Sequence, residues 1–254
     1  MCTATWYFTA DGYELFFNRD ELRTRAVARP PEPATTRQVR YLAPTDGEAG
    51  GTWLALSEFG LAVGLLNAHP MAVSLDGPVV SRGHLLRDLA DLAQPSDLPD
   101  RLEAMDLQRI PPFTLFALSR VGRCEVIDYD GSTLSRRRLT EPALLSSSSI
   151  EAGGATVPRA LELSRHLEGA ADPASAHLAF HRSHQPARGP LSPCMHRPDA
   201  RTVSFCHVQV NAERGTLAYV QGPPCRLATP STLSLALSTG RAAGSSVNPS
   251  SRRG

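Results

Sequence analysis

Two β-hairpins near the start of the chain restrict the fold most strongly. Residues 3–9 are rich in β-branched and aromatic residues, Asp11-Gly12 is a strong two-residue turn signal, and residues 13–17 form the return strand. A second hairpin joins residues 51–56 to residues 61–66 through a short turn. Its second strand is almost wholly apolar, which indicates burial between two layers. The sequence therefore predicts antiparallel sheets covered on both faces.

Helical patterns alternate with further strands. Ser81 is expected to cap a helix in which leucines recur at helical spacing. Further helices are expected near residues 98–107, 157–167 and 173–184, and further strands at residues 113–119, 124–128, 202–210 and 216–220. Residues 23–40 are rich in Arg, Pro and Thr and are expected to form an extended loop. Hairpins separated by pairs of helices indicate an α+β fold and not a doubly wound parallel sheet.

Composition excludes several classes of function. The formal net charge is +1, which argues against a broad nucleic-acid-binding surface. All 26 basic residues are arginine, so lysine chemistry such as a Schiff base is excluded. No apolar run approaches the roughly 20 residues that span a bilayer, and we see no secretory signal. The five cysteines are widely spaced and odd in number, which indicates a reducing compartment; we expect a cytoplasmic protein without a disulfide framework.

Cys2 is the first candidate for catalysis. Removal of the initiator methionine is expected when residue 2 is small, and it would make Cys2 the N-terminal residue. One residue would then carry a thiol nucleophile and, in its α-amino group, a base with a pKa of about 7.7–8.0. A strand that starts at residue 3 would hold this terminus against a sheet. The alternative is a small second residue with no catalytic role.

The residues expected around Cys2 come from strand ends. Arg19 and Asp20 stand at the return end of the first hairpin, which brings them close to residue 2. Arg19 could lower the pKa of the thiol and Asp20 could orient the amine, or the two could form a solvated ion pair. Asn67 ends the apolar strand, where its amide could donate to an oxyanion or bond its own turn.

A histidine-rich segment near residue 180 has two interpretations. His177, His181 and His184 are spaced i, i+4 and i+7, so they share one helix face, and Cys194 and His196 follow. A pair such as His184 and His196 could bind zinc or haem, but the spacing matches no standard zinc motif. We therefore expect a polar helix face followed by a structural loop, with no metal and no cofactor.

Two other features are interpreted as structural. The run of arginines at 136–138 is expected to form a solvated edge strand whose charges oppose edge-to-edge association. Cys225 follows Gly-Pro-Pro and is expected to be a small apolar residue at a turn. Arg197 could bind a substrate carboxylate or could pair with Asp199.

Six short motifs occur in order along the chain. They are MCT at 1–3, NRDE at 18–21, GGTWLAL at 50–56, GLLNAH at 64–69, SRG at 81–83 and SPCMHRPDARTVSF at 192–205. Together they resemble the NRDE family, also called the Transport and Golgi organisation protein 2-like family, which is placed among the N-terminal nucleophile (Ntn) hydrolases. The resemblance implies a four-layer αββα sandwich of two mainly antiparallel sheets, in a single domain over residues 1–227. Residues 228–254, which have little pattern, are expected to form a disordered tail.

The resemblance also implies roles for individual residues. It extends to cysteine enzymes such as choloylglycine hydrolases, penicillin V acylases and penicillin acyltransferases. By this resemblance Cys2 matches the nucleophile, Arg19 the thiolate-stabilising cation, Asp20 the amine-orienting carboxylate and Asn67 an oxyanion donor. The acylases present a second Asn from a strand in mid-chain, where this chain has serines at 146–149.

Three further residues, Asn18, Trp53 and Arg197, are assigned to substrate binding. The leading hypothesis is an N-terminal-cysteine amidohydrolase or acyltransferase that acts on a non-peptide C–N bond of a small acylated molecule. The alternative is a non-catalytic protein on the same fold that binds or carries a lipid acyl group, an acyl thioester or haem. A third hypothesis is an interaction protein that docks a partner through residues 23–40. Oligomeric state is left open.

Overall fold

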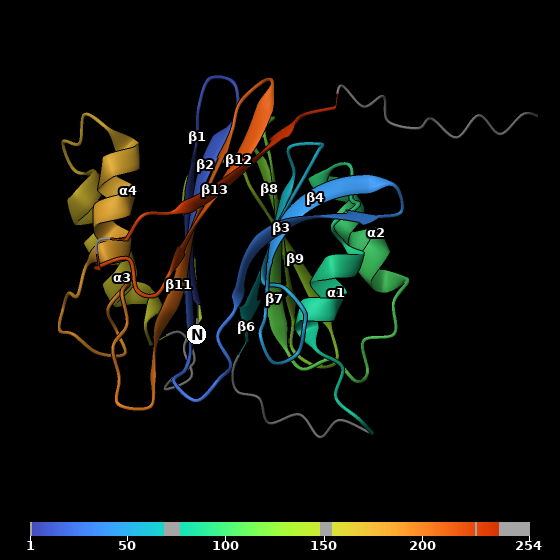
Figure 1. Ribbon diagram of the computed structural model, residues 1–254, viewed down its shortest axis with the longest axis horizontal. Coiled ribbons are helices and arrows are strands. Elements are labelled where there is room, and N and C mark those ends of the chain that lie inside the picture. Colours follow the sequence, from blue (N-terminus) through green and yellow to red (C-terminus); the bar gives the residue numbers. More distant parts are fainter. Residues whose placement is uncertain (1, 69–76, 148–153, 227, 239–254) are drawn as a thin grey trace, which may run out of the picture.

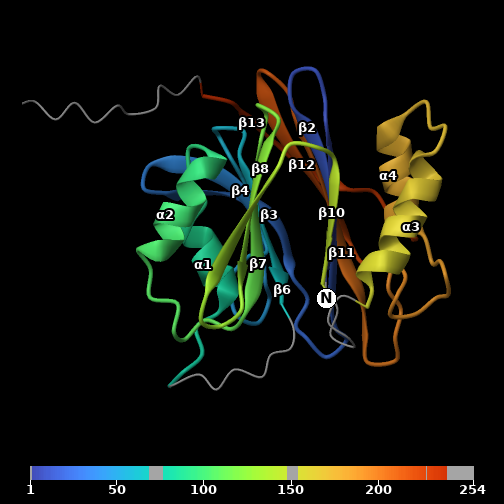
Figure 2. The same cartoon turned by 180° about the vertical axis from the view of Figure 1, so that it is seen from behind.

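Two antiparallel sheets lie face to face, and each carries helices on its outer side (Figure 1). The computed structural model describes residues 2–68, 77–147, 154–226 and 228–238. Viewed from behind, the four layers follow one another as helices, sheet, sheet and helices (Figure 2). The expected α+β fold with an αββα order of layers is therefore confirmed.

The six-stranded sheet has the order β10-β1-β2-β11-β12-β13. Its strands are β1 (Cys2–Phe8), β2 (Tyr13–Leu22), β10 (Ala143–Ser146), β11 (Ala200–Val210), β12 (Arg214–Gln221) and β13 (Ser231–Ala236). The first hairpin is β1–β2, and it runs further than the sequence predicted because β2 continues through the Asn-Arg-Asp segment. This extension brings Arg19 directly opposite Cys2 in the antiparallel register.

The seven-stranded sheet has the order β3-β4-β5-β6-β7-β8-β9. Its strands are β3 (Arg29–Thr36), β4 (Val39–Thr45), β5 (Leu54–Ser57), β6 (Ala62–Asn67), β7 (Phe113–Ser119), β8 (Arg123–Tyr129) and β9 (Leu134–Leu139). The second predicted hairpin is β5–β6, and β6 lies between β5 and β7 in the middle of the sheet. The apolar β6 is buried along most of its length, as its sequence predicted.

Within the described residues, four α-helices cover the outer faces of the two sheets. They are α1 (Arg82–Asp88) and α2 (Leu98–Glu103) on the seven-stranded sheet, and α3 (Thr156–Leu167) and α4 (Pro173–Arg182) on the six-stranded sheet. A 3-10 turn at Pro95–Asp97 precedes α2. Ser81 caps α1 as expected, because its Oγ accepts a hydrogen bond from the Gly83 N–H at 3.3 Å.

Two segments expected to lack regular structure are strands. The predicted loop at 23–40 contains β3 and the start of β4, joined at Arg37 and Gln38 with φ angles of 44° and 70°. Its prolines are tolerated because β3 is the edge of its sheet, where a missing N–H breaks no ladder. The predicted disordered tail is wrong for Ser231–Ala236, because β13 pairs with β12 and buries Leu235. Residues 239–254 of that tail lie outside the described residues.

The arginine run forms an edge strand, as predicted. It lies in β9, the last strand of the seven-stranded sheet. Arg136 and Arg138 both pair with the buried Glu125, and Arg137 pairs with Asp128 at 2.9 Å. The three arginines therefore form ion pairs with carboxylates on β8, and the guanidinium groups stay at the edge of the sheet.

Candidate functional site

Cys2 begins β1 at the open end of the space between the sheets, and its side chain is only 7% exposed. Its backbone N–H donates to Ser147 Oγ at 2.9 Å, and the Ser147 N–H donates to the Cys2 carbonyl at 3.0 Å. These contacts arise because β10 pairs with β1 on the side opposite β2. Ser146 and Ser147 of the serine segment therefore lie beside Cys2, and Ser148 and Ser149 fall outside the described residues.

Burial is the largest influence on the Cys2 thiol and raises its pKa. The charge of Asp20 raises the pKa further, whereas the Arg19 guanidinium lowers it. The net pKa lies above the ordinary value of 9.0. Arg19 thus lowers the pKa of the thiol, as the sequence predicted, but its effect is smaller than the rise that burial causes.

Arg19 is fixed on three sides. Its guanidinium forms a short ion pair with Asp46, which directly follows β4, and lies 3.6 Å from a Glu21 carboxylate oxygen. The guanidinium carbon also lies 4.3 Å from the centre of a Trp53 ring, within cation–π range. Asp46 in turn accepts two hydrogen bonds from Arg25, each at 2.9 Å. The cation opposite Cys2 is therefore held in place by both sheets.

Asp20 lies in a second, fully buried polar group. Its Oδ1 accepts from Thr202 Oγ1 at 2.6 Å, and its Oδ2 lies 3.6 Å from Arg159 Nη2. Burial raises the pKa of Asp20, and the opposing charge of Arg159 lowers it. Arg159 also donates to Thr3 Oγ1 at 2.6 Å and to Ser146 Oγ at 2.9 Å. This network joins β1 to its two neighbouring strands, β2 and β10, next to Cys2.

A cavity of about 420 Å³ opens in front of Cys2. Among its lining residues are Cys2, Arg19, Asp20, Trp53, Asn67, Arg82, Met195 and Arg197. Asn67 comes from the end of β6, so the second sheet supplies this amide as the sequence predicted. Arg197 pairs with Asp199 at 2.7 Å, as one of its two alternatives expected, and it also lies in the cavity wall; its binding of a substrate carboxylate stays a prediction. The cavity thus contains six of the seven predicted site residues.

Asn18 is the exception. It is fully buried and does not line the cavity. Its amide donates to the carbonyls of His181 and Pro193, each at 2.9 Å. Successive side chains of β2 point to opposite faces of the sheet, so Asn18 faces the helices; its expected role in substrate binding has no support from this position and stays a prediction.

The predicted polar face of histidines is wrong for two of its members. His177 and His181 are buried, and both ring systems lie within hydrogen-bonding distance of Thr5 Oγ1, at 2.7 and 2.9 Å. Both rings also stack on Phe16. Burial lowers the pKa of His177 to about 4, so this histidine is a neutral part of the core. His184 lies beyond the end of α4 and adopts a different environment, near His196.

Several residues of the site were not found from the sequence. Arg159 carries one signal: it lies four residues before Leu163, on the face of α3 that is buried. Asp46 carries no local signal, because the pairing of distant strands brings it to the site. Ser147 belongs to the serine segment that the resemblance set against the second Asn of the acylases, but its contact with the Cys2 nitrogen was not predicted. Arg82 belongs to the SRG motif but received no role; its Nη1 donates to the Pro112 carbonyl at 2.8 Å while the side chain lines the cavity.

Solved structures share this architecture at low sequence identity. A penicillin V acylase from Agrobacterium tumefaciens is 12% identical, with a TM-score of 0.58 over 92% of this chain and 86% of that chain. An N-acylethanolamine-hydrolyzing acid amidase ortholog from Caenorhabditis elegans is 14% identical, with a TM-score of 0.56 over 82% and 92%. A conjugated bile acid hydrolase variant from Clostridium perfringens is 12% identical, with a TM-score of 0.51 over 87% and 89%. These matches show the Ntn-hydrolase fold.

Comparison by sequence identifies the family. No curated protein matches the chain. None of the described helices has the length and apolar character needed to cross a membrane. The profile of the Transport and Golgi organisation 2 family matches residues 1–180, which is more than half of the sequence. The ordered motifs, the paired sheets and this match together show that the chain belongs to the Transport and Golgi organisation 2 family.

Proposed function

We propose that the protein is an N-terminal-cysteine amidohydrolase or acyltransferase that acts on a non-peptide C–N bond of a small acylated molecule. The observation that carries the proposal is the placement of Cys2 in the wall of a 420 Å³ cavity, opposite Arg19 in the strand register. The likeness to penicillin V acylase and to the acid amidase ortholog supports this class of substrate, since both are acylases or amidases by name.

The reaction begins with removal of Met1, which frees the α-amino group of Cys2. The amine takes the thiol proton, and the thiolate sulfur attacks the carbonyl carbon of the substrate. Asn67, on the opposite sheet, donates to the oxyanion as it forms. The ammonium then gives its proton to the leaving nitrogen as the C–N bond breaks, which leaves an acyl thioester on Cys2. Water or an acceptor amine attacks that thioester and restores the thiol.

Ser147 and Asp20 prepare the amine for this role. The nitrogen of Cys2 already lies 2.9 Å from Ser147 Oγ, so the serine is placed to orient the free amine. Asp20 supplies a buried negative charge on β2, the strand that pairs with the start of β1. Arg19 favours the thiolate and keeps its position through Asp46. Trp53 and Arg197 line the cavity and are the proposed substrate contacts.

A covalent probe tests the proposal directly. The mature protein is incubated with an activated acyl ester, and the adduct is located by peptide mass mapping. We expect one adduct, on Cys2, and none in the Cys2→Ala variant. That variant keeps the other four cysteines, which therefore serve as internal controls for thiol reactivity. Equal labelling of wild type and Cys2→Ala would reject the proposed nucleophile.

One observation favours the alternative, a protein that binds a lipid acyl group, an acyl thioester or haem without turnover. Burial raises the pKa of the Cys2 thiol, which reduces the fraction of reactive thiolate near neutral pH. The two functions differ in the state of the terminus, because an amine blocked by Met1 cannot act as the base. Retained Met1, together with tight binding of a fatty acyl probe by Cys2→Ala, would favour binding over catalysis.

A further inference from the structure

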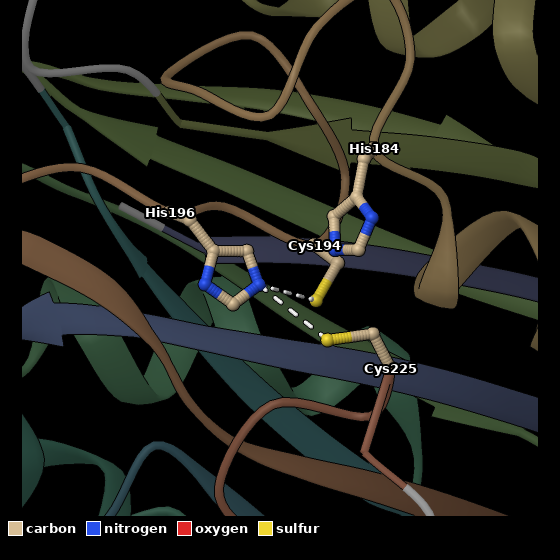
Figure 3. Close-up of side chains that lie close together, drawn as sticks. All are labelled: His184, Cys194, His196 and Cys225. Carbon is tan, nitrogen blue, oxygen red and sulfur yellow. Dashed lines mark hydrogen bonds between the residues drawn. The ribbon is translucent and has the colours of Figure 1, made fainter.

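Four metal-ligating side chains from three separate segments meet outside the Cys2 cavity (Figure 3). His184 follows α4, Cys194 and His196 precede β11, and Cys225 follows β12. One ligand atom from each residue lies within 4.8 Å of the ligand atoms of the other three. None of the four residues lines the cavity in front of Cys2. The cluster is therefore separate from the site proposed for acyl chemistry.

The distances within the cluster suit a tetrahedral ion. The Cys194 and Cys225 sulfur atoms lie 3.6 and 3.5 Å from His196 Nε2. Zinc bonds of about 2.3 Å to sulfur and about 2.0–2.1 Å to nitrogen, at tetrahedral angles, separate a sulfur ligand from a nitrogen ligand by about 3.5 Å. The rings of His184 and His196 are also close, with centroids 5.1 Å apart and planes at 64°. The four ligands are thus near the positions that a zinc ion requires.

Two polar atoms of the cluster are shielded from water. Nε2 of His184 is buried and has no hydrogen-bond partner among the described residues. Cys194 is fully buried. A buried ring nitrogen without a partner loses its hydration without compensation, and a bound cation would satisfy it. The unpaired nitrogen of His184 therefore points to a bound ligand that the protein itself does not supply.

The backbone presents the ligands from fixed positions. The Cys194 N–H donates to the Ser183 carbonyl at 3.0 Å, which ties the residue before His184 to the Cys194 loop. Cys194 and His196 are two residues apart and both side chains reach the cluster, while Met195 between them lines the Cys2 cavity. The Gly222 N–H donates to the Val203 carbonyl at 2.8 Å and anchors the turn that leads to Cys225.

We propose that His184, Cys194, His196 and Cys225 form a structural zinc site. Two thiolates and two imidazoles in tetrahedral arrangement are a ligand set typical of zinc. Four protein ligands leave no open position for a substrate, so the ion would act as a cross-link and not as a catalyst. A haem is disfavoured because its macrocycle would need the space that the two sulfur atoms occupy beside His196.

The proposed ion joins the end of α4 to the segments that flank β11 and β12. It would close a link between the helical layer and the six-stranded sheet. Met195 faces the Cys2 cavity while both of its neighbours face the ion, so zinc would also fix one wall of that cavity. The proposal does not depend on catalysis by Cys2, because the ligands and the cavity residues are different side chains.

Metal content tests the site. The full chain without an affinity tag is reduced, incubated with zinc chloride and dialysed, and zinc, copper and iron are then measured by mass spectrometry of the elements. We expect about one zinc per chain in the wild type, as four ligands for one ion require. Cys225→Ser and His184→Ala should each lose retained zinc. The matched control Cys2→Ala removes a cysteine outside the cluster and should keep a full equivalent.

A second measurement uses the wild-type chain, so its result does not depend on whether a variant folds. Cobalt(II) added to the reduced wild-type chain should give the visible absorption of a tetrahedral site and a sulfur-to-cobalt charge-transfer band, and added zinc should bleach both. A chelator should lower the Tm of the wild type but not that of Cys225→Ser. The proposal would be overturned if the wild type retained no zinc and gave no such cobalt spectrum. It would also be overturned by copper or iron in place of zinc, or by a Cys194–Cys225 disulfide in protein purified under reducing conditions.

Discussion

At Cys2, burial and charge act on the thiol in opposite directions. Burial raises the pKa of the thiol most, and the Arg19 guanidinium partly offsets that rise. The sequence predicted the proximity of these two residues because hairpin pairing follows from a local turn. It did not predict the degree of burial, because burial depends on the opposite sheet. The reactivity of Cys2 therefore depends on Arg19, whose proximity the sequence predicted, and on packing against the opposite sheet, which the sequence did not predict.

Replacing Arg19 tests its effect on the thiol. Arg19→Gln removes the cation, so the pKa of Cys2 should rise and the thiolate fraction at a given pH should fall. The rate of Cys2 alkylation, followed by peptide mass mapping from pH 6 to 11, should drop several-fold near pH 8, and its midpoint should move to higher pH. The matched control Arg123→Gln, at an exposed position of β8, should leave the profile unchanged. An unshifted profile for Arg19→Gln would exclude the electrostatic role.

Arg159 and Asp20 form a pair that has no access to solvent. Arg159→Met would leave the Asp20 carboxylate without its buried cation, and breaking such a pair by removing one partner typically costs about 3–5 kcal/mol. Urea unfolding at pH 7 should show a loss of this size. Arg165→Met on the same helix removes an exposed arginine, with a side chain 71% exposed, and should change the free energy of unfolding by less than about 0.5 kcal/mol. Equal effects of the two substitutions would contradict the importance of the buried pair.

At the scale of elements, local signals predicted some strands and missed others. The turn at Asp11-Gly12 and the alternation around it were sufficient for the β1–β2 hairpin. β3 was missed because its three prolines normally argue against a strand, yet an edge position tolerates them. β13 was missed because its serines and threonine face outward and only Leu235 is buried. These two edge strands therefore escaped prediction because one side of an edge strand needs no partner, which relaxes the sequence pattern; the edge strand β9 was predicted.

The packing of β13 can be tested at Leu235. Its side chain is 8% exposed and belongs to the core between the sheets. Leu235→Ala should lower the free energy of unfolding by about 2 kcal/mol, the lower end of the range for buried leucines, because the site lies at a sheet edge. Leu161→Ala, at a position that is 58% exposed, is the size-matched control and should have little effect. If both variants unfolded at the wild-type urea midpoint, β13 would not contribute to the fold in solution.

The same scale explains why the proposed zinc site has no sequence signature. Its ligands belong to three connections that only the finished sheet brings together, so their spacing follows no zinc motif. The spacing His177, His181 and His184 indicated one helix face, but the helix ends at Arg182. His184 therefore leaves that face and joins His196. Because α4 ends two residues earlier than predicted, the interpretation of the histidine-rich segment changed.

Considering the whole molecule, the site exists because residues from both sheets line one cavity. β1 and β2 supply Cys2, Arg19 and Asp20, whereas the seven-stranded sheet supplies Asn67, and Trp53 stands just before β5. The motif resemblance anticipated this set, but no local pattern places Asp46 against Arg19. The family match extends over residues 1–180 and the remaining strands complete the sheet that carries Cys2. The assignment of one domain to residues 1–227 stays a prediction.

The ion pair between Arg19 and Asp46 links the two sheets and should make stability depend on pH. Burial alone would raise the pKa of Asp46, but hydrogen bonds from Arg25 and the backbone lower it from 3.8 to about 2. A carboxyl with a lowered pKa stabilises the folded state above about pH 4, and this stabilisation is lost as the pH falls toward 2. Asp46→Asn should therefore lose about 2 kcal/mol at pH 7 and almost nothing at pH 2.

Urea unfolding of wild type and Asp46→Asn at several pH values measures this difference. Asp11→Asn replaces an exposed carboxylate in the first turn and is the control for a general change of charge. A difference between wild type and Asp46→Asn that did not shrink in acid would show that packing, and not the charge of Asp46, holds the two sheets together at this point.

The identity of the mature N-terminus tests the central claim most directly. Intact mass spectrometry of the purified chain, before and after exposure to an activated acyl ester, reports both the loss of Met1 and the gain of an acyl group. We predict a chain that begins at Cys2 and takes up one acyl group, and a Cys2→Ala variant that takes up none. A chain that keeps Met1 and gains no acyl group would contradict the account, because its nucleophile would have no base.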